Sequence, residues 1–302
     1  MTPVIIDTDP GIDDALALLL AWGSPELGVE ALTTVAGNVP LDVATRNAFR
    51  LVRLRRPARV PPVAMGAARP LARALVTATR YHGADGLGDL GDWPPVDETP
   101  AAEPAWEVLC AAARAHGPAL TLVALGPLTN LALALEHDAG ALARIGRLVA
   151  MGGAVDVPGN VTPTAEFNMH VDPEAAVRVL AAGLPLDLVP LDATGQAVLE
   201  RSALEAALGR RPGPLATRIA AFTERGFRID TAAGGRGMLL HDPLAVGVAF
   251  DPTLVTWERV ALAIGPEGET RRSGGPANCR VARVVDQPRF LATFLERLCP
   301  AS

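Results

Sequence analysis

Four aspartates lie within eight residues near the start of the chain, directly after the apolar run Pro3-Val4-Ile5-Ile6. Their segment reads Asp7-Thr8-Asp9-Pro10-Gly11-Ile12-Asp13-Asp14. Carboxylates held this close repel one another and raise one another's pKa unless a cation or a proton offsets the charge. Residues 15–21 are strong helix formers, and the first turn of a helix favours acidic side chains. The segment therefore predicts a strand, an acidic turn with a site for a hard cation, and a helix.

Two other kinds of structure also place acidic residues in such a turn. An EF-hand loop that began at Asp7 would need an oxygen ligand at its fifth position, Gly at its sixth and Glu at its twelfth. The chain has Gly11, Ile12 and Leu18 there, so this interpretation fails. A solvated acidic cap on a helix is the commoner arrangement. The cation site is favoured over it because Asp7 and Asp9 stand where a buried strand would end, just before a Pro-Gly turn.

Composition excludes several classes of function. The chain has 302 residues and 49% hydrophobic residues, enough for one large α/β domain. The net charge is −6, and the only dense basic stretch, residues 53–56, resembles a solvated helix end, so nucleic acid is not an expected partner. The sequence contains no Lys, which excludes Schiff-base chemistry and a Walker-A phosphate site. No apolar run approaches the roughly 20 residues of a membrane span, so we expect a cytoplasmic protein without a membrane partner.

Strand-like and helix-like patterns alternate along the chain, which predicts a single α/β domain over residues 1–302, built on an open, mostly parallel sheet with helices on both faces. The expected strands are residues 4–7, 29–35, 60–65, 119–125, 147–151, 186–191, 254–263 and 280–285. The expected helices are residues 13–22, 42–54, 103–115, 128–135, 173–181, 199–208, 215–227 and 242–250, with a last helix ending at residue 298. Residues 66–100 are rich in Gly and Pro and predict a long excursion beside the sheet.

Polar residues recur where the expected strands end. Ligands of an open parallel sheet bind at the carboxyl ends of its strands, so we expect these residues to converge on one pocket. The residues are Asp7, Asp9, Asn38, the segment 125–130 and the segment 151–154. Asn160, Glu166 and Asn168 follow on an expected loop, where amides and a carboxylate suit a ligand with several hydroxyl groups. His241 and Asp242 open a late helix, although Asp242 alone is equally typical of a helix N-cap and His241 of a structural imidazole.

Taken together, these motifs resemble the inosine-uridine preferring nucleoside hydrolase family. The matching segments are Asp7 to Ala15, Thr34 to Asn38, Gly126 to Asn130, Met151 to Ala154, Ala165 to Asn168 and His241 to Pro243. The resemblance implies a calcium-dependent enzyme that hydrolyses the N-glycosidic bond of ribonucleosides to ribose and free base. It also implies a single α/β domain that assembles as a homodimer or homotetramer.

The resemblance assigns roles to individual residues. It implies that Ca²⁺ is bound by the carboxylates of Asp9, Asp14 and Asp242 and by the main-chain carbonyl of Leu125. Asp7 would support this site from behind. The ribose hydroxyls would be held by Asn160, Glu166 and Asn168, in a pocket that Asn38 and Met151 also line. Calcium accepts six to eight oxygen ligands, including backbone carbonyls, so a Leu at this position is compatible with the site.

The chemistry of glycosidic cleavage suggests a mechanism for such a site. Bond breaking leaves positive charge on the ribose ring, which carboxylates and amide oxygens stabilise more in the transition state than in the neutral substrate. We expect a calcium-bound water with Asp13 as its general base. The leaving base needs a proton or other stabilisation, for which His241 is the first candidate and His82, in the Gly-rich segment, a possible second contact.

The sequence leaves base preference and alternative functions open. Residues 225–240, which would contact the base, match the family least well, and Phe227, Arg228 and Asp230 are the candidate contacts. A metal-dependent phosphatase of the haloacid dehalogenase type also carries Asp-x-Asp after its first strand, but it would leave Glu166 to Asn168 unexplained. A catalytically silent nucleoside-binding protein remains a further alternative.

Overall fold

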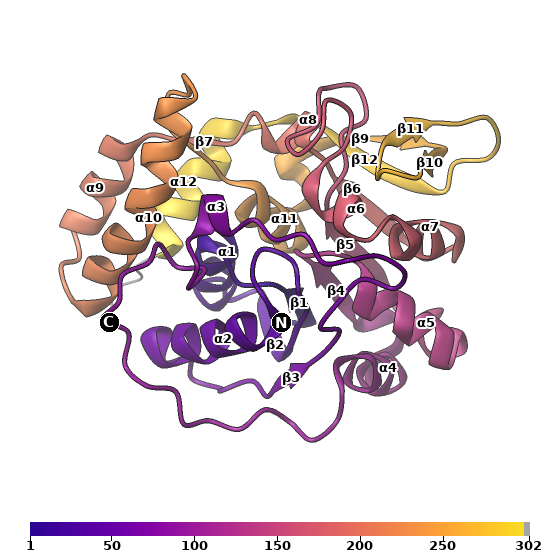
Figure 1. Cartoon of the computed structure of the whole chain (residues 1–302), viewed down its shortest axis with the longest axis horizontal. Helices are drawn as coiled ribbons and strands as arrows, with labels where there is room; N and C mark the ends of the chain where they lie inside the picture. The colour runs from indigo at the N-terminus through magenta and orange to yellow at the C-terminus, as the bar shows by residue number, and fades with distance from the viewer. Residues whose placement is uncertain (299–302) are drawn as a thin grey trace.

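The computed structural model describes residues 1–298 and has an eight-stranded central sheet in the order β3-β2-β1-β4-β5-β6-β12-β9 (Figure 1). All paired neighbours are parallel except β9, which runs antiparallel to β12. The strands are β1 (Thr2–Thr8), β2 (Leu27–Thr34), β3 (Val63–Met65), β4 (Thr121–Ala124), β5 (Arg147–Met151), β6 (Leu186–Val189), β9 (Val255–Val260) and β12 (Cys279–Val285). The expected open, mostly parallel α/β sheet is confirmed.

Helices cover both faces of this sheet. The longer ones are α1 (Ile12–Trp22), α2 (Leu41–Arg55), α4 (Ala105–His116), α5 (Thr129–Leu142), α7 (Pro173–Ala181), α9 (Arg201–Gly209), α10 (Pro214–Ala232), α11 (His241–Phe250) and α12 (Gln287–Leu298). Val4 and Ile6 of β1 face a core shared with α1, α2, α9, α10, α11 and α12, and Ile5 faces a second core shared with α4, α5 and α7. This alternation is the period of two expected of a strand buried on both faces.

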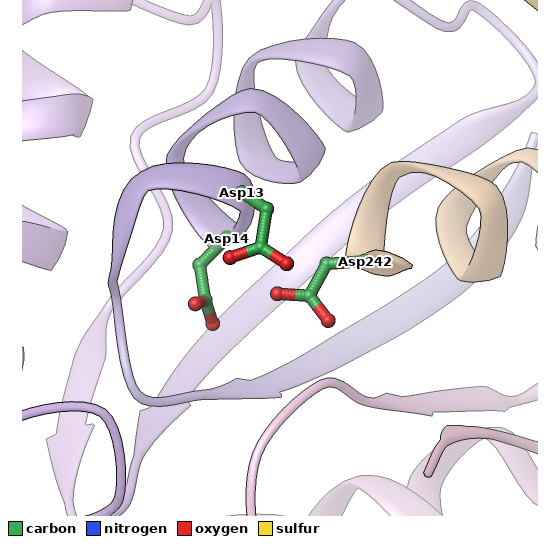
Figure 2. Close-up of side chains that lie close together, drawn as sticks. All are labelled: Asp13, Asp14 and Asp242. Carbon is green, nitrogen blue, oxygen red and sulfur yellow. The ribbon is translucent and has the colours of Figure 1, made fainter. Parts of the chain in front are cut away.

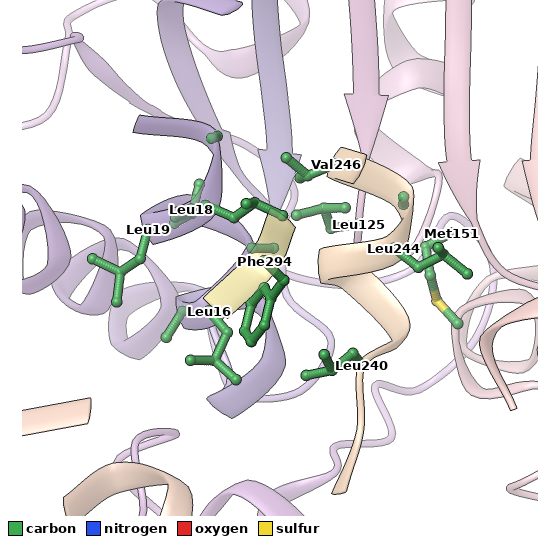
Figure 3. Close-up of a cluster of buried hydrophobic side chains, with 14 of the residues drawn as sticks. Leu16, Leu18, Leu19, Leu125, Met151, Leu240, Leu244, Val246 and Phe294 are labelled. Carbon is green, nitrogen blue, oxygen red and sulfur yellow. The ribbon is translucent and has the colours of Figure 1, made fainter. Parts of the chain in front are cut away.

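The packing of α1 against α11 places the site. Leu16, Leu18 and Leu19 of α1 and Leu244 and Val246 of α11 are fully buried, and they belong to one apolar cluster with Phe294 of α12 (Figure 3). Burial of side chains of this size is the main source of stability in such a core. Helix α1 begins just after β1, and the first turn of α11 lies beside the first turn of α1, so both helices begin at the carboxyl end of β1.

Several boundaries differ from the sequence prediction. The strand expected over residues 254–263 is divided at Ala261 into β9 and β10 (Leu262–Ile264), and β10 pairs with β11 (Thr270–Arg272). Helix α5 runs seven residues further than expected because a kink at Asp138 joins two helical pieces. Five short elements were not predicted, because segments of so few residues show no hydrophobic periodicity. They are α3 (Thr79–His82), α6 (Phe167–Val171), α8 (Leu191–Thr194), β7 (Val198–Leu199) and β8 (Met238–Leu239). No described helix is both long and apolar enough to cross a membrane.

An ion-pair cluster around the buried Asp187 connects the amino ends of β5, β6 and β12, at the end of the sheet opposite the site. The Asp187 carboxylate of β6 accepts hydrogen bonds from Arg147 of β5 and Arg280 of β12, each at 2.7 Å. The Asp187 side chain is only 2% exposed. The ring of Trp257 lies beside both guanidinium groups. Asp187 and Arg147 are mostly buried and need a counter-charge, because a lone buried charge is far less stable than a paired one, whereas the Arg280 side chain is 46% exposed.

We expect Asp187→Ala to lower the free energy of unfolding by roughly 3 kcal/mol, because it leaves the mostly buried Arg147 without its counter-charge. Glu136→Ala, which breaks the exposed pair with Arg178, is the matched control and should change stability by less than about 1 kcal/mol. Denaturant unfolding of the three proteins measures both values. Equal stability losses for the two variants would contradict the assignment of Asp187 as the buried centre of this cluster.

Candidate functional site

Three carboxylates meet where α1 and α11 begin. Asp13 and Asp14 lie in the first turn of α1 and Asp242 in the first turn of α11, and their side chains point toward one another (Figure 2). One oxygen from each lies within 4.8 Å of the others, which is a spacing that one metal ion can bridge. The N-cap of α11 is Leu240, so Asp242 is not the capping residue that its sequence context also allowed.

Asp9 stands beside this cluster and is held by the loop after β2. The Asp9 Oδ2 atom accepts a hydrogen bond from the Asn38 main-chain N–H at 2.6 Å, and the Asn38 side-chain amide donates to Asp14 Oδ2 at 2.9 Å. Gly37 lets the loop approach this closely, because a Cβ there would lie 2.1 Å from Asp9 Oδ2. Asn38 therefore connects two of the expected metal ligands.

The remaining oxygen of Asp9 indicates what this site can bind. Asp9 and Asp14 have no exposed surface, which rules out a solvated acidic cap. Asp9 Oδ1 is buried and has no hydrogen-bond partner within residues 1–298. A buried carboxylate oxygen without a donor is costly, and a cation is the partner that would satisfy it.

Asp14 is held more firmly than Asp13. Asp14 Oδ1 accepts from the Thr8 hydroxyl at 2.6 Å, and Asp14 Oδ2 accepts from the Gly11 N–H at 3.0 Å in addition to Asn38. Asp13 is the member of the cluster that solvent partly reaches. The cluster thus contains one carboxylate fixed by neighbouring donors and one that is open to a substrate or a water.

Charge crowding and burial act together on these groups. Burial, followed by repulsion from Asp14, raises the pKa of Asp13 to about 8, and the same causes raise the pKa of Asp9 well above its ordinary value. The pKa of Asp242 is raised by burial and then by repulsion from the other three aspartates. A divalent cation would oppose all of these shifts, since it favours the ionised form of each carboxylate.

Asp7 lies in β1, and its carboxylate contacts residues of β2 and α5, whereas its expected role as a support of the metal ligands stays a prediction. Its Oδ1 atom accepts from the Thr33 hydroxyl at 2.5 Å and from the Asn130 amide at 2.7 Å, whereas Oδ2 is buried without a partner. Burial raises the pKa of Asp7 to about 7. The same Asn130 amide donates to the Thr34 carbonyl of β2. No individual role was predicted for Asn130, although it belongs to one of the motifs that the sequence shows.

Leu125 directly follows β4, Met151 is the last residue of the neighbouring β5, and both share one partner. The Asn168 side-chain amide donates to the Leu125 carbonyl at 2.7 Å and to the Met151 carbonyl at 3.2 Å. The Leu125 carbonyl, which was expected to bind calcium, therefore faces Asn168 at the carboxyl ends of the strands. Asn168 occupies one of the two lone pairs of this carbonyl oxygen. Gly126, the next residue, packs directly against Asp9, which places Leu125 next to the acidic cluster.

Glu166 and Asn160 organise the loop that was expected to hold ribose. The Glu166 carboxylate caps α6 and accepts three main-chain hydrogen bonds, from Gly153, Asn168 and Met169. Burial raises the pKa of Glu166. Asn160 is exposed, and its side-chain oxygen accepts from the Phe167 N–H at 2.9 Å. Both residues thus fix the backbone around Asn168, and Asn160 does so from the surface.

Two histidines border the acidic cluster. His82 is buried in α3, and its Nδ1 atom accepts from the Ile12 N–H at 3.0 Å. The contact needs Gly11, because a Cβ there would lie 2.5 Å from the His82 ring. His241 Nδ1 lies 2.7 Å from the hydroxyl of Thr194, a residue whose role no sequence pattern indicated. Burial lowers the pKa of each histidine to about 4, so both rings are neutral near pH 7.

The three residues expected to contact the base lie in different surroundings. Phe227 is 2% exposed in the apolar core, so it is wrong as a base contact. Arg228 lies on the exposed side of α10. Asp230 is half-buried and accepts hydrogen bonds from the Tyr81 hydroxyl at 3.0 Å and the Leu239 N–H at 3.2 Å. Its charge contributes to the raised pKa of Asp13, which makes Asp230 the candidate nearest the cluster.

The chain is similar to known proteins over nearly its whole length. The sequence model described as inosine-uridine preferring nucleoside hydrolase matches residues 4–292. The chain is 36% identical over 313 residues to the pyrimidine-specific ribonucleoside hydrolase RihA of Salmonella typhimurium, with 98% of each chain covered. It is 37% identical over 309 residues to an uncharacterised protein of Schizosaccharomyces pombe, again with 98% of each covered.

Solved structures give the same result. A plant nucleoside hydrolase superposes with a TM-score of 0.91 at 36% identity and covers 99% of each chain. A purine-preferring ribonucleoside hydrolase from Gardnerella vaginalis superposes with a TM-score of 0.93 at 32% identity and covers 98% of each.

The raised pKa values predict how stability depends on pH. An unperturbed aspartate has a pKa of 3.8, against about 7 for Asp7 and about 8 for Asp13 in the fold. Above about pH 6.5 the folded, metal-free protein then binds more protons than the unfolded chain, so its melting temperature should fall as pH rises from about 6.5 to about 8. Below that range His82 and His241, whose pKa is lowered from 6.5 to about 4, act in the opposite direction. Added Ca²⁺ should reduce this fall, since it stabilises the ionised carboxylates. Thermal unfolding with chelator and with Ca²⁺ measures both trends. A metal-free melting temperature that rises over this window would contradict the prediction.

Proposed function

The chain belongs to the inosine-uridine preferring nucleoside hydrolase family and hydrolyses ribonucleosides to ribose and free base, and on this premise we propose that Asp13 is its general base and Ca²⁺ its metal. Family membership decides against the phosphatase and the silent binding protein. The observation that carries the proposal is the meeting of Asp13, Asp14 and Asp242 within 4.8 Å beside the unpartnered oxygen of Asp9.

Calcium fits the donor set of this site. The ligands would be Asp9, Asp14 and Asp242 through their carboxylates and Leu125 through its carbonyl, which are all hard oxygen donors of the kind Ca²⁺ prefers. The buried, unpaired Asp9 Oδ1 supports a cation at this position. When bound, the ion supplies the positive charge that keeps the carboxylates ionised and polarises a water molecule.

Asp13 is suited to accept the proton of the attacking water. It belongs to the carboxylate cluster, yet solvent partly reaches it, whereas Asp14 is fully buried and held by Thr8, Gly11 and Asn38. A general base needs an oxygen that can reach the reacting water, and a ligand needs a fixed oxygen. This difference supports the base role for Asp13 and the ligand role for Asp14.

The ribose would lie against the loop of residues 151–168. Asn168 brings its amide to the Leu125 and Met151 carbonyls, and the Glu166 carboxyl group lies close by as the cap of α6. These oxygen-rich groups would stabilise the positive charge that develops on the ribose ring. Asn160 would fix the loop and offer its amide N–H groups from the exposed side.

His241 would assist the departure of the base as a neutral donor. Because burial lowers its pKa to about 4, the ring near pH 7 offers one N–H and not the extra proton of an imidazolium. A hydrogen bond of this kind stabilises negative charge on the leaving base without a prior protonation step. His82 is held against Ile12 in the same neutral state and would provide a second donor.

We also propose that the chain assembles as a homodimer or homotetramer, as the resemblance to the family implies.

Base preference is the property on which the named relatives differ, since one is called pyrimidine-specific and another purine-preferring at similar identity. A panel of inosine, adenosine, guanosine, uridine and cytidine would measure this preference for the present chain.

The calcium proposal predicts a reversible loss of activity. Protein treated with chelator should release no ribose from inosine or uridine, and Ca²⁺ should restore the release because its ligands are already placed by the fold. Reducing-sugar assays on the same sample before and after the addition of Ca²⁺ measure this. Full activity in a preparation shown to be free of metal would contradict the proposal.

The Asp13 proposal predicts a loss of turnover without a loss of fold. Asp13→Asn should lower kcat by the ~10²–10⁴-fold typical of a missing general base, while Ca²⁺ binding, measured by calorimetry, persists. Asp42→Asn is a suitable control, because Asp42 also lies in the first turn of a helix but is exposed and pairs with Arg46. A tenfold or smaller effect on the chemical step would assign the base role to another carboxylate.

A further inference from the structure

Thr194 is a fully buried residue at the end of α8, and its hydroxyl oxygen lies 2.7 Å from Nδ1 of His241. A hydroxyl and an imidazole nitrogen can each donate or accept, so the distance alone does not fix the direction of the bond. The direction matters because a neutral imidazole carries one proton, and that proton is on the nitrogen that does not accept.

The surroundings of Thr194 settle which group donates. Two buried helical threonines elsewhere in the chain, Thr45 and Thr223, give their hydroxyl proton to a carbonyl of the preceding turn. The Thr194 hydroxyl makes no such bond among residues 1–298, and His241 Nδ1 is the acceptor within reach. If Nδ1 carried a proton instead, the buried hydroxyl proton would have no acceptor, which is unfavourable. Thr194 therefore donates, and the imidazole proton of His241 resides on Nε2.

His82 provides an internal comparison. Its Nδ1 accepts from the main-chain N–H of Ile12, a group that can only donate, so the neutral ring must carry its proton on Nε2. The same tautomer thus arises for both histidines from different donors. The one at His241 depends on a single side-chain hydroxyl, which can be removed by substitution.

Helix α8 is itself fixed to the site loop, which gives the hydroxyl a defined place. The Asp192 carboxylate accepts from the Val155 and Asp156 N–H groups and from Arg283 of β12. The Leu191 N–H donates to the Gly153 carbonyl. Thr194 therefore keeps a constant position relative to the loop that follows β5.

We propose that Thr194 is a positioning residue that holds His241 in the tautomer with Nε2–H, so that the free N–H is the donor available to the departing base. The proposal rests on the leaving-group role given to His241 above. It predicts that the Thr194 hydroxyl matters only for substrates whose base needs a donor in order to leave.

The kinetic test compares two kinds of substrate with calcium-loaded protein. Thr194→Val should lower kcat for inosine or uridine about tenfold or more and leave 4-nitrophenyl riboside, whose leaving group departs as a stable anion, nearly unaffected. Thr194→Ser, which keeps the hydroxyl, should recover most of the lost rate. Thr223→Val removes an equally buried hydroxyl that bonds its own helix and should show no difference between the substrates.

The spectroscopic test reads the tautomer directly. The chain has five histidines, so ¹⁵N-histidine labelling gives few imidazole signals, and His241→Gln identifies the signal of His241. Wild-type protein should show protonated Nε2 and unprotonated Nδ1, and Thr194→Val should add the other tautomer.

Two results would overturn the proposal. One is protonated Nδ1 at His241 in the wild-type protein, which needs no variant to fold. The other is an equal loss by Thr194→Val on both kinds of substrate, since a merely structural role would act regardless of the leaving group. Absence of hydrolysis by the wild-type protein would instead remove the proposed function and leave the tautomer measurement valid.

Discussion

Electrostatic repulsion among buried carboxylates is the constraint around which this structure is arranged. Asp9, Asp13, Asp14 and Asp242 are brought together by the starts of two packed helices and the end of β1, although burial and mutual repulsion raise the pKa of Asp9, Asp13 and Asp242. The fold tolerates this because the apolar contact between α1 and α11 is extensive and because a cation would offset the charge. Stability and metal binding are therefore linked in this protein.

Hydrogen-bond donors give different roles to side chains of the same chemical type. Donors from Thr8, Gly11 and Asn38 fix Asp14, whereas Asp13 in the next position keeps an accessible carboxylate. The same logic extends to the histidines, whose Nδ1 atoms are occupied so that Nε2 is left as the donor. In each case the immediate neighbours, and not the residue type, decide which proton transfer or contact is possible.

Much of the fold followed from local patterns. The strand at residues 147–151 and the helix at residues 173–181 have the predicted bounds, since periodic apolar residues and clear end signals mark both. Prediction failed where tertiary contacts override local signals. The kink at Asp138 extends α5, and elements as short as α3 and α8 exist because the rest of the chain holds them. Phe227 was expected near the base because of its place in the sequence, but its side chain packs into the core.

The sequence by itself determined the chemistry that this protein can perform, because the four aspartates, the amides and His241 are residue types that suit metal binding and glycosidic cleavage. It also determined that these residues would lie at the same end of the sheet, since parallel strands place their carboxyl ends together. Only the tertiary structure decided which of these groups are free to act. Hydrogen-bond partners such as Asn38, Asn130 and Thr194 come from distant segments, and burial, which sets the pKa values, is a property of the whole packed chain and of no local pattern.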